Sequence, residues 1–405
     1  MNCRRIKVIT SFGELDAVRA FWESEQWHPG ADYEFFRMIA QTRKEVLSPC
    51  VLAVFEGENM IALLAGRLEQ THLPIRFAYT TLARISLRQL ILVEGGFMGN
   101  RTSEIWEFIL GYLQQLFHNL EVDRIVIEQV RIGSIEQETV LRRIGRGRLS
   151  GSGVNTEHWL MQIPASWDDF LKGRSKKHRY WIKRLSGVLD REFPGKWSIK
   201  VFARADEVSD FAQSSEAVSS KTYQRGLGVG FRLQEEAVRR LQQEADYGLL
   251  RGYVLYILGE PKAFWYCFVY GSTLYLAATG YDPAFRDYEI GTVLLMRVFQ
   301  DHCGTKIKTV DFGLGDAGYK QRFGTEKYYE TVLFLFPNSI RGYALNALQL
   351  VTTCANKSAK ALLVRFRVIQ QLKTRWRRKI ERKLTPGADS ESNNALLETV
   401  EKPNR

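Results

Sequence analysis

The order of strand and helix patterns between residues 249 and 336 constrains the fold more than any other feature of this sequence. Three apolar stretches, LLRGYVLYIL, KAFWYCFVY and TLYLAATG, are separated by short GEP and GS turns and predict three successive strands. A loop, YDPAFRDYEIG, then precedes a helical pattern GTVLLMRVFQDHC, a strand KTVDFG, a short helix and a last strand YETVLFLF. The predicted order is therefore three strands, a loop, a helix, a strand, a short helix and a strand.

The first half of the chain shows a similar order. A strand and a helix are predicted by VITSFGELDAVRAFWES, two strands by VLAVFEGENMIALLAGRL, a helix by EIWEFILGYLQQLFHNL and a buried strand by DRIVIEQV. The Gly-, Ser- and Arg-rich stretch from Gly145 to Asn155 has no periodicity and is typical of a connection between domains. Because 405 residues exceed the usual size of a single core, we predict domains over 1–150 and 151–340. The similar order allows two copies of one fold.

The character of the chain changes beyond residue 340. Residues 341–385 are predicted to form a basic amphipathic helical extension, and the polar tail 386–405 is predicted to be disordered. Eleven basic residues and one acidic residue between 357 and 383 leave a charge of +10 there, out of +12 for the whole chain. Such a helix can lie on an anionic membrane surface, pack back onto the domain or bind nucleic acid.

The sequence contains no apolar run near the roughly 20 residues of a membrane span, and its start lacks the apolar core of a signal peptide. We therefore expect a cytoplasmic protein, with peripheral contact at the inner face of the membrane through 357–383. The five cysteines lie far apart, without a CxxC pair and without a histidine at metal-ligand spacing. No metal site and no disulfide framework are expected.

The join between the strand TLYLAATGY and the helix that starts near Gly291 predicts a phosphate-binding site. The first N–H groups of a helix have no partners within it and carry partial positive charge, so they bind phosphate. Gly291 would let a pyrophosphate approach the backbone, and Arg286 would add a charged contact. The alternative is that Gly291 only starts the helix and Arg286 is a solvated loop charge.

A second candidate group lies in DFGLGDAGYKQRFG. Asp311 is expected at the carboxyl end of a strand, where it could orient or deprotonate an acceptor. Tyr319 could protonate a leaving thiolate, and Lys320 could bind the donor. The structural alternatives are a turn-capping Asp311, a core Tyr319 and a surface Lys320.

Together these motifs resemble a known family. The combination of YDPAFRDYEIG, LL and DFGLGDAGYKQRFG resembles the C-terminal domain of the CelD-like branch of the GNAT superfamily, related to the FemAB peptidyltransferases. The resemblance covers residues 167–336, and it covers the first half only in element order and in short pieces such as LRQLILVEGG and DRIVIEQV. It implies an α+β fold of two tandem GNAT-like domains, each a mixed twisted sheet flanked by helices.

The resemblance also implies roles for individual residues. The loop from Arg286 through Ile290 to Gly291, and the helix from Thr292, would bind the pyrophosphate of an acyl-CoA cosubstrate such as acetyl-CoA. Tyr319 falls where GNAT enzymes often place the tyrosine that protonates the thiolate. Acceptor contacts would come from Lys221, Tyr223 and Arg225. The usual GNAT loop carries two small residues, as Q/R-x-x-G-x-G/A, whereas this chain carries only Gly291.

The function implied is transfer of an acyl group from acyl-CoA to an amine or hydroxyl of a cell-envelope or exopolysaccharide precursor, such as a sugar or lipid-linked sugar. Amine attack on a thioester needs positioning and one proton acceptor, which fits the absence of a Ser-His-Asp or metal motif. Two alternatives stay open. One is aminoacyl-tRNA-dependent transfer, with tRNA on the basic helix DDFLKGRSKKHRYWIKR. The other is a non-catalytic GNAT-like binding module.

Overall fold

The computed structural model describes residues 4–77, 80–151, 155–222, 225, 230–315 and 317–365. Tyr223, the predicted tail 386–405 and most of the basic segment 357–383 lie outside the described residues. The chain divides into two compact units: unit 1 is Met1–Gln162, Tyr270–Tyr275 and Ile307–Leu362, and unit 2 is Ile163–Val269, Leu276–Lys306 and Leu363–Arg405. These units are defined by contacts in space. The predicted domain boundaries 1–150 and 151–340 concern two copies of one fold along the sequence and stay a prediction.

Unit 1 is built on a mixed sheet in the order β1-β3-β4-β5-β6-β14-β8-β13, with β2 paired to β4 and β7 to β14. The neighbours β5 and β6 run parallel, and the other printed pairs along this order are antiparallel. Its strands are β1 (Arg4–Ile9), β2 (Val46–Pro49), β3 (Val51–Glu56), β4 (Asn59–Phe77), β5 (Thr80–Gly99), β6 (Arg124–Arg131), β7 (Leu149–Gly151), β8 (Thr156–Gln162), β13 (Thr309–Leu314) and β14 (Glu326–Leu335). Its helices are α1 (Phe12–Glu25), η1 (Pro29–Ala31), α2 (Tyr33–Thr42), α3 (Ser103–Asn119), α4 (Ile135–Arg143), η2 (Arg146–Arg148), α12 (Gly318–Phe323) and α13 (Ile340–Arg365).

The two faces of this sheet bury two separate cores. Because side chains alternate along a strand, Leu52 and Leu64 point to one face, where they pack with α3 and α4, and Val51 and Leu63 point to the other. The second face is covered by α1 and α2, whose Trp22 is completely buried. Fully buried aliphatic and aromatic side chains on both faces are the main source of stability for such a sheet.

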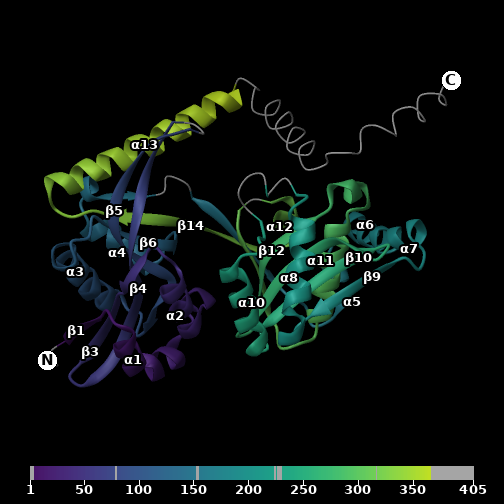
Figure 1. The fold of residues 1–405 in the computed structure, drawn as a ribbon, viewed down its shortest axis with the longest axis horizontal. Helices are drawn as coiled ribbons and strands as arrows, with labels where there is room; N and C mark the ends of the chain where they lie inside the picture. Colours follow the sequence, from purple (N-terminus) through teal and green to yellow (C-terminus); the bar gives the residue numbers. More distant parts are fainter. Residues whose placement is uncertain are drawn as a thin grey trace. The chain divides into compact units, whose positions relative to one another are not determined.

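Helix α13 follows the last strand after a short connection, residues 336–339, and lies along unit 1 (Figure 1). Leu345 on this helix joins a small buried cluster with Leu73, Leu87 and Phe336. Among the described residues, no helix is both long and apolar enough to cross a membrane. The first part of the predicted basic extension therefore packs on the domain, and its side chains from residue 356 onward are not described.

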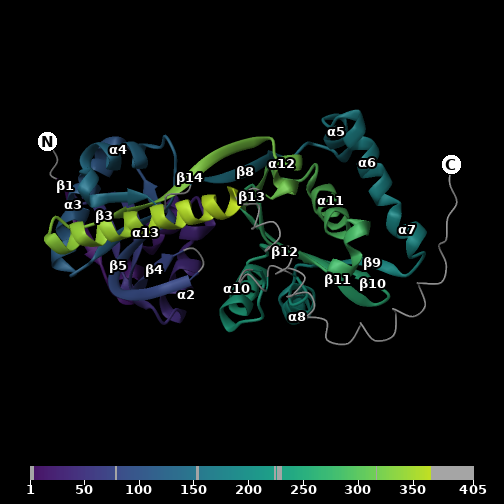
Figure 2. The ribbon, with the colours of Figure 1, turned by 90° about the horizontal axis from the view of Figure 1, so that it is seen from above.

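Unit 2 has helices on both faces of a sheet in the order β12-β11-β10-β9 (Figure 2). Its strands are β9 (Trp197–Phe202), β10 (Leu250–Ile257), β11 (Glu260–Tyr270) and β12 (Thr273–Tyr281), of which the first three residues of β12 belong to unit 1. Its helices are α5 (Trp167–Lys172), α6 (Lys176–Ser186), α7 (Val188–Glu192), η3 (Ala205–Glu207), α8 (Val208–Ser219), α10 (Glu235–Asp246), η4 (Pro283–Tyr288) and α11 (Ile290–His302). The neighbours Trp265 and Tyr266 on β11 show the alternation: Trp265 Nε1 donates to Gly291 O on α11, and Tyr266 OH donates to Glu244 on α10.

The same order of elements occurs twice along the chain. When the short strands β2 and β7 and the 3-10 helices are set aside, a strand, two helices, three strands, a helix, a strand, a short helix and a final strand run from β1 to β8 and again from β9 to β14. Within unit 1 the final strands are exchanged: β14, from the second copy, pairs with β6 of the first, and β8, from the first copy, pairs with β13 of the second. The predicted α+β fold, a mixed sheet flanked by helices, is confirmed, and the repeated order of elements agrees with two copies of one fold.

Candidate functional site

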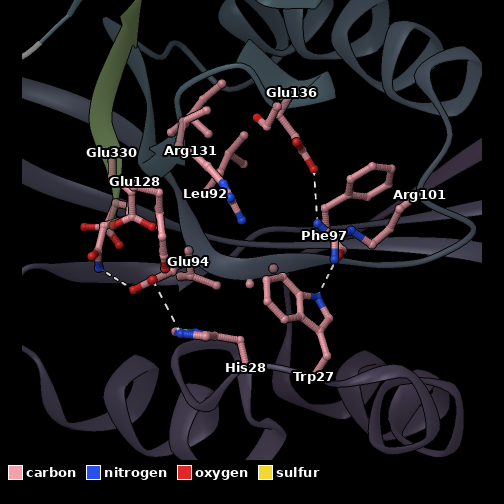
Figure 3. A pocket seen from close by; sticks show the side chains of 18 of the residues that line it. Trp27, His28, Leu92, Glu94, Phe97, Arg101, Glu128, Arg131, Glu136 and Glu330 are labelled. Atoms are coloured by element: carbon pink, nitrogen blue, oxygen red, sulfur yellow. Dashed lines mark hydrogen bonds and ion pairs between the residues drawn. The ribbon is translucent and has the colours of Figure 1, made fainter. Parts of the chain in front are cut away.

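A cavity of about 550 Å³ opens in unit 1 where two parallel strands separate. Strands β5 and β6 pair in parallel as far as Leu92 and Ile127, and the residues that follow line the cavity. Figure 3 shows Glu94, Glu128 and Glu330 together at one side. The other side holds Trp27, Phe97 and Arg101. A pocket of this size with convergent polar groups is the expected form of a small-molecule site.

Two of the carboxylates that line this cavity, Asp311 and Glu330, hold a buried imidazole between them. His158 Nε2 lies 2.7 Å from Asp311 Oδ1, and His158 Nδ1 lies 3.1 Å from Glu330 Oε2. The ring stacks on Tyr328 with the centroids 4.7 Å apart. Because the three polar residues come from β8, β13 and β14, the exchanged strands bring them together.

The charge state of His158 follows from this arrangement. Burial by itself lowers the pKa of His158, but the hydrogen bonds and charges of Asp311 and Glu330 outweigh burial and raise the pKa to about 9. The imidazole is therefore protonated at neutral pH and donates both N–H groups. It supplies one positive charge to two buried carboxylates.

A second polar pair, Glu94 and His28, lies in the same cavity. Gly30 N donates to His28 Nδ1 at 3.1 Å, so the proton of the neutral ring is on Nε2, which lies 3.4 Å from Glu94 Oε1. Burial lowers the pKa of His28 to about 4, and burial together with the charge of Glu330 raises the pKa of Glu94 to about 8. At neutral pH this contact therefore joins two mostly neutral groups and is not a pair of opposite charges. Gln129 Nε2 also donates to Glu94.

Glycine at position 95 makes the close packing around His28 possible. The backbone of Gly95 has φ +72°, and a Cβ built there would lie 2.3 Å from His28 Cβ. A side chain at this position would therefore collide with the ring that contacts Glu94. The following Gly96 is also crowded, since a Cβ there would lie 2.8 Å from Ala65 O.

The structure places the three predicted residues of the second motif in different surroundings. Asp311 is buried and lines the cavity, and its Oδ1 also accepts from Gly313 N at 2.6 Å. Lys320 is buried as well, with Nζ donating to Gly313 O at 3.1 Å and to Leu314 O at 2.6 Å, which fixes the end of β13. Tyr319 on α12 is half-buried, and its ring centroid lies 6.1 Å from that of Phe312.

The predicted donor-binding residues lie in unit 2 at the junction of η4 and α11. Counted from Arg286, Gly291 occupies the last small position of the pattern Q/R-x-x-G-x-G/A, and Glu289 occupies the first. Glu289 has φ +50° and ψ +36°, the left-handed conformation that glycine adopts most easily. Glu289 therefore adopts the backbone conformation that a glycine at this position of the pattern would adopt. Arg286 is exposed, whereas the side chain of Ile290 is completely buried, so that only the backbone of Ile290 can contact a ligand.

The start of α11 has no side-chain cap. Glu289 O accepts from Thr292 N at 2.8 Å and from Val293 N at 3.1 Å, and the side chain of Glu289 is held by α6. Trp181 Nε1 donates to Glu289 Oε1 at 3.1 Å, and Arg184 Nη2 lies 3.9 Å from the same oxygen. These contacts place the basic helix α6 beside the start of α11, where positive charge favours an anion.

Two of the predicted acceptor-binding residues are described, both in unit 2. Lys221 Nζ lies 3.3 Å from Asp282 Oδ2, and Asp282 also caps η4 by accepting from Ala284 N at 3.1 Å. Lys221 is thereby joined to the segment that carries Arg286. Arg225 forms an ion pair with Glu216 and donates to Phe231 O at 3.2 Å.

Sequence reasoning missed most of the cavity. It selected Asp311 but not its partners His158 and Glu330, and it quoted VEGG and DRIVIEQV without singling out Glu94 or Glu128. The signal that selected Asp311, a carboxylate at the end of an apolar strand pattern, was also present at those two positions. Among the described residues, no group of His, Cys, Asp and Glu side chains is arranged to hold a metal ion.

Comparison with known proteins gives a family match for one segment of the chain and structural similarity over most of its length. Residues 176–321 match the acetyltransferase (GNAT) domain. This GNAT segment begins at α6 and includes the junction of η4 and α11, and the match supports an acyltransferase at the level of the family. No curated protein matches the sequence.

The similarity to solved structures covers more of this chain than the GNAT segment. FemX is 12% identical with a TM-score of 0.53, and the match covers 86% of this chain and 100% of FemX. The C-terminal domain of a putative lysylphosphatidylglycerol synthetase from Agrobacterium fabrum is 10% identical (TM-score 0.47; 84% and 96% covered). A tandem GNAT protein from the clavulanic acid biosynthesis pathway is 9% identical (TM-score 0.46; 82% and 98% covered). At such low identity the likeness to FemX concerns the fold alone.

Proposed function

We propose that this protein is an acyltransferase that moves an acyl group from acyl-CoA, with acetyl-CoA as the first donor to test, to an amine or hydroxyl. The observation that carries the proposal is the start of α11 inside the GNAT segment. Arg286, the left-handed Glu289 and Gly291 follow the spacing of the GNAT pyrophosphate loop, and the helix that follows has no side-chain cap. Its first N–H groups can therefore donate to a pyrophosphate.

The chemistry requires few groups. The acceptor nitrogen or oxygen attacks the thioester carbonyl, a bond to carbon forms, the C–S bond breaks, and the acceptor proton passes to a base while the thiolate takes a proton. Asp311 is the proposed base, and Tyr319 is the proposed proton donor. Arg286, Ile290, Gly291, Thr292 and Lys320 are proposed for the donor, and Lys221, Tyr223 and Arg225 for the acceptor.

The proposed acceptor class is a cell-envelope or exopolysaccharide precursor, such as a sugar or lipid-linked sugar. This part of the proposal is supported by the resemblance of the two sequence motifs to the CelD-like branch. A cytoplasmic protein in peripheral contact with an anionic membrane through 357–383 would meet such an acceptor at the inner face of the membrane.

A second candidate function is aminoacyl-tRNA-dependent transfer. The fold of FemX and the exposed basic helix α6 favour it, because lysines and arginines around an aromatic side chain suit a phosphate-bearing ligand. Tyr180 on this helix is 73% exposed. A third candidate, a non-catalytic GNAT-like module, predicts that disrupting the start of α11 leaves biological activity unchanged.

We expect wild-type protein to bind acetyl-CoA and the variant Gly291→Trp to bind it at least about 100-fold more weakly, measured by isothermal titration calorimetry. An indole at position 291 would cover the first turn of α11 and exclude the pyrophosphate. Charge-assisted hydrogen bonds contribute about 1.5–3 kcal/mol each, so losing two of them accounts for this factor. A Cβ at Gly291 would make only ordinary contact with Tyr281, at 3.4 Å, which makes Gly291→Ala a mild companion variant.

The matched control is Gly111→Trp, which places the same side chain on the exposed surface of α3, where a Cβ would meet no atom within 4 Å. Circular dichroism of all variants checks that the fold is kept. Wild-type protein that binds neither acetyl-CoA nor a longer acyl-CoA contradicts the proposed donor. Tight, salt-sensitive binding of tRNA would then favour the second candidate.

A further inference from the structure

The unit 1 cavity gathers carboxylates from four different strands. Glu94 lies on β5, Glu128 on β6, Asp311 on β13 and Glu330 on β14, and all four line the same space. Burying carboxylates together is costly unless a positive charge compensates them. The surrounding cations therefore decide what the cavity can hold.

The protein supplies only part of that compensation. His158 donates to one oxygen of Asp311 and to one oxygen of Glu330, and each of these two acidic residues is more than 90% buried. In the part of the chain that the structure describes, no hydrogen-bond donor reaches Asp311 Oδ2, Glu330 Oε1 or the carboxylate of Glu128, and none of these oxygens is sealed from solvent. All three residues line the cavity, so these oxygens offer acceptor positions to a molecule bound there.

The arginines of the lining are engaged elsewhere. Arg101 Nη2 lies 3.3 Å from Glu136 Oε1, and its guanidinium lies 4.4 Å from the ring centroid of Trp27. Arg131 lies 4.5 Å from the ring centroid of Tyr328, and its Nη2 is 4.0 Å from Glu326 Oε1. At the acidic end, the single charge of His158 therefore faces the carboxylates of Asp311 and Glu330. Burial raises the pKa of the nearby Glu128, and the charges of Arg67 and Arg43 lower it.

The raised pKa of Glu94 reflects the negative charge around it. Burial and the charges of Glu330, Asp311 and Glu128 raise the pKa of Glu94 and the charge of His158 lowers it, which together brings the pKa to about 8. His28 faces Glu94 as a neutral ring and Gln129 as an amide donor. A cation placed among these groups would relieve the repulsion and lower the pKa of Glu94.

The remaining walls suit an organic cation better than a bare ion. Tyr275 lies with its ring centroid 5.9 Å from that of His28, and the rings of Tyr328, Trp106 and Trp27 also line the space. Aromatic faces attract ammonium groups and pack against the alkyl part of a ligand.

We propose that this cavity binds a small organic molecule through a protonated amine, which takes the free carboxylate oxygens of Glu128, Asp311 and Glu330 as its hydrogen-bond acceptors. The binding does not depend on the proposed function. Only the assignment of this amine as the acyl acceptor rests on that function.

The test compares two probes of equal length by isothermal titration calorimetry of the full chain: n-pentylamine, which is protonated at pH 7, and 1-pentanol, which is neutral. We expect saturable binding of pentylamine that is at least about tenfold tighter than that of pentanol. Titration in two buffers of different ionisation enthalpy should show that pentylamine, unlike pentanol, releases protons at pH 7, because the cation lowers the pKa of Glu94. Affinity for pentylamine should also rise as the pH increases toward 8.

Glu128→Gln should weaken pentylamine about tenfold without changing the affinity for pentanol. Glu58→Gln, in an exposed turn of the same unit where the side chain is 96% exposed, is the matched control and should change neither. Equal affinity for the two probes, no saturable binding of pentylamine, or a Glu128→Gln variant that behaves like the control would overturn the proposal. Acetyl-CoA is titrated into the same preparation, so that loss of donor binding alone counts only against the proposed function.

Discussion

Replacing His158 by alanine is expected to lower the free energy of unfolding by about 3–5 kcal/mol. The imidazolium donates to Asp311 at 2.7 Å and to Glu330 at 3.1 Å, and all three side chains are buried. Its removal leaves two carboxylates without their shared cation in a site where water cannot fully replace it. Urea denaturation followed by circular dichroism at pH 7 measures the difference.

The matched control is His72→Ala on β4, where the histidine is exposed. It should change the free energy of unfolding by less than about 0.5 kcal/mol. A loss below about 1 kcal/mol for His158→Ala would mean that the imidazolium is not what compensates the two carboxylates.

The pH dependence of this effect follows from the raised pKa of His158. A base whose folded-state pKa lies above its unfolded value of 6.5 stabilises the fold fully below that value and loses this contribution as the pH rises through about 9. The difference between wild type and His158→Ala should therefore be smaller at pH 9.5 than at pH 7. An unchanged difference across this range would show that the histidine acts by packing alone.

Gly95→Ala is expected to lower the free energy of unfolding by about 3 kcal/mol. Two costs add: the backbone has φ +72°, and the new Cβ would lie 2.3 Å from His28 Cβ. Gly57→Ala separates them, because Gly57 has φ +63° but open space around it, and it should lose only about 1 kcal/mol. Chemical denaturation of both variants gives the comparison, and equal losses would show that His28 moves aside without cost.

Much of the local structure could be predicted from the sequence. The pattern DRIVIEQV became β6, GTVLLMRVFQDHC became α11, and the three stretches after residue 249 became β10, β11 and β12. These patterns report the alternation of buried and exposed positions in neighbouring residues, so they need no knowledge of distant contacts. The similar order of elements in the two halves allowed two copies of one fold, and the resemblance to the CelD-like branch implied the tandem arrangement.

The loop at Arg286 is a place where the sequence pattern alone was insufficient. The family pattern has a glycine at the position where this chain has Glu289. The structure shows that Glu289 nevertheless adopts the left-handed backbone, with its side chain held by Trp181 on α6. Over 100 residues separate these partners, so the sequence could not show what stabilises this conformation.

The sequence by itself determined the helices and strands, their repeated order and the carboxylate at the end of β13, since all of these depend on neighbouring residues. Only the tertiary structure decided what surrounds that carboxylate. Asp311 meets His158 across 153 positions, and His158 meets Glu330 across 172, because the final strands of the two copies are exchanged. Strand pairing over such distances is set by the packing of the whole sheet, and with it the charge, pKa values and shape of the cavity.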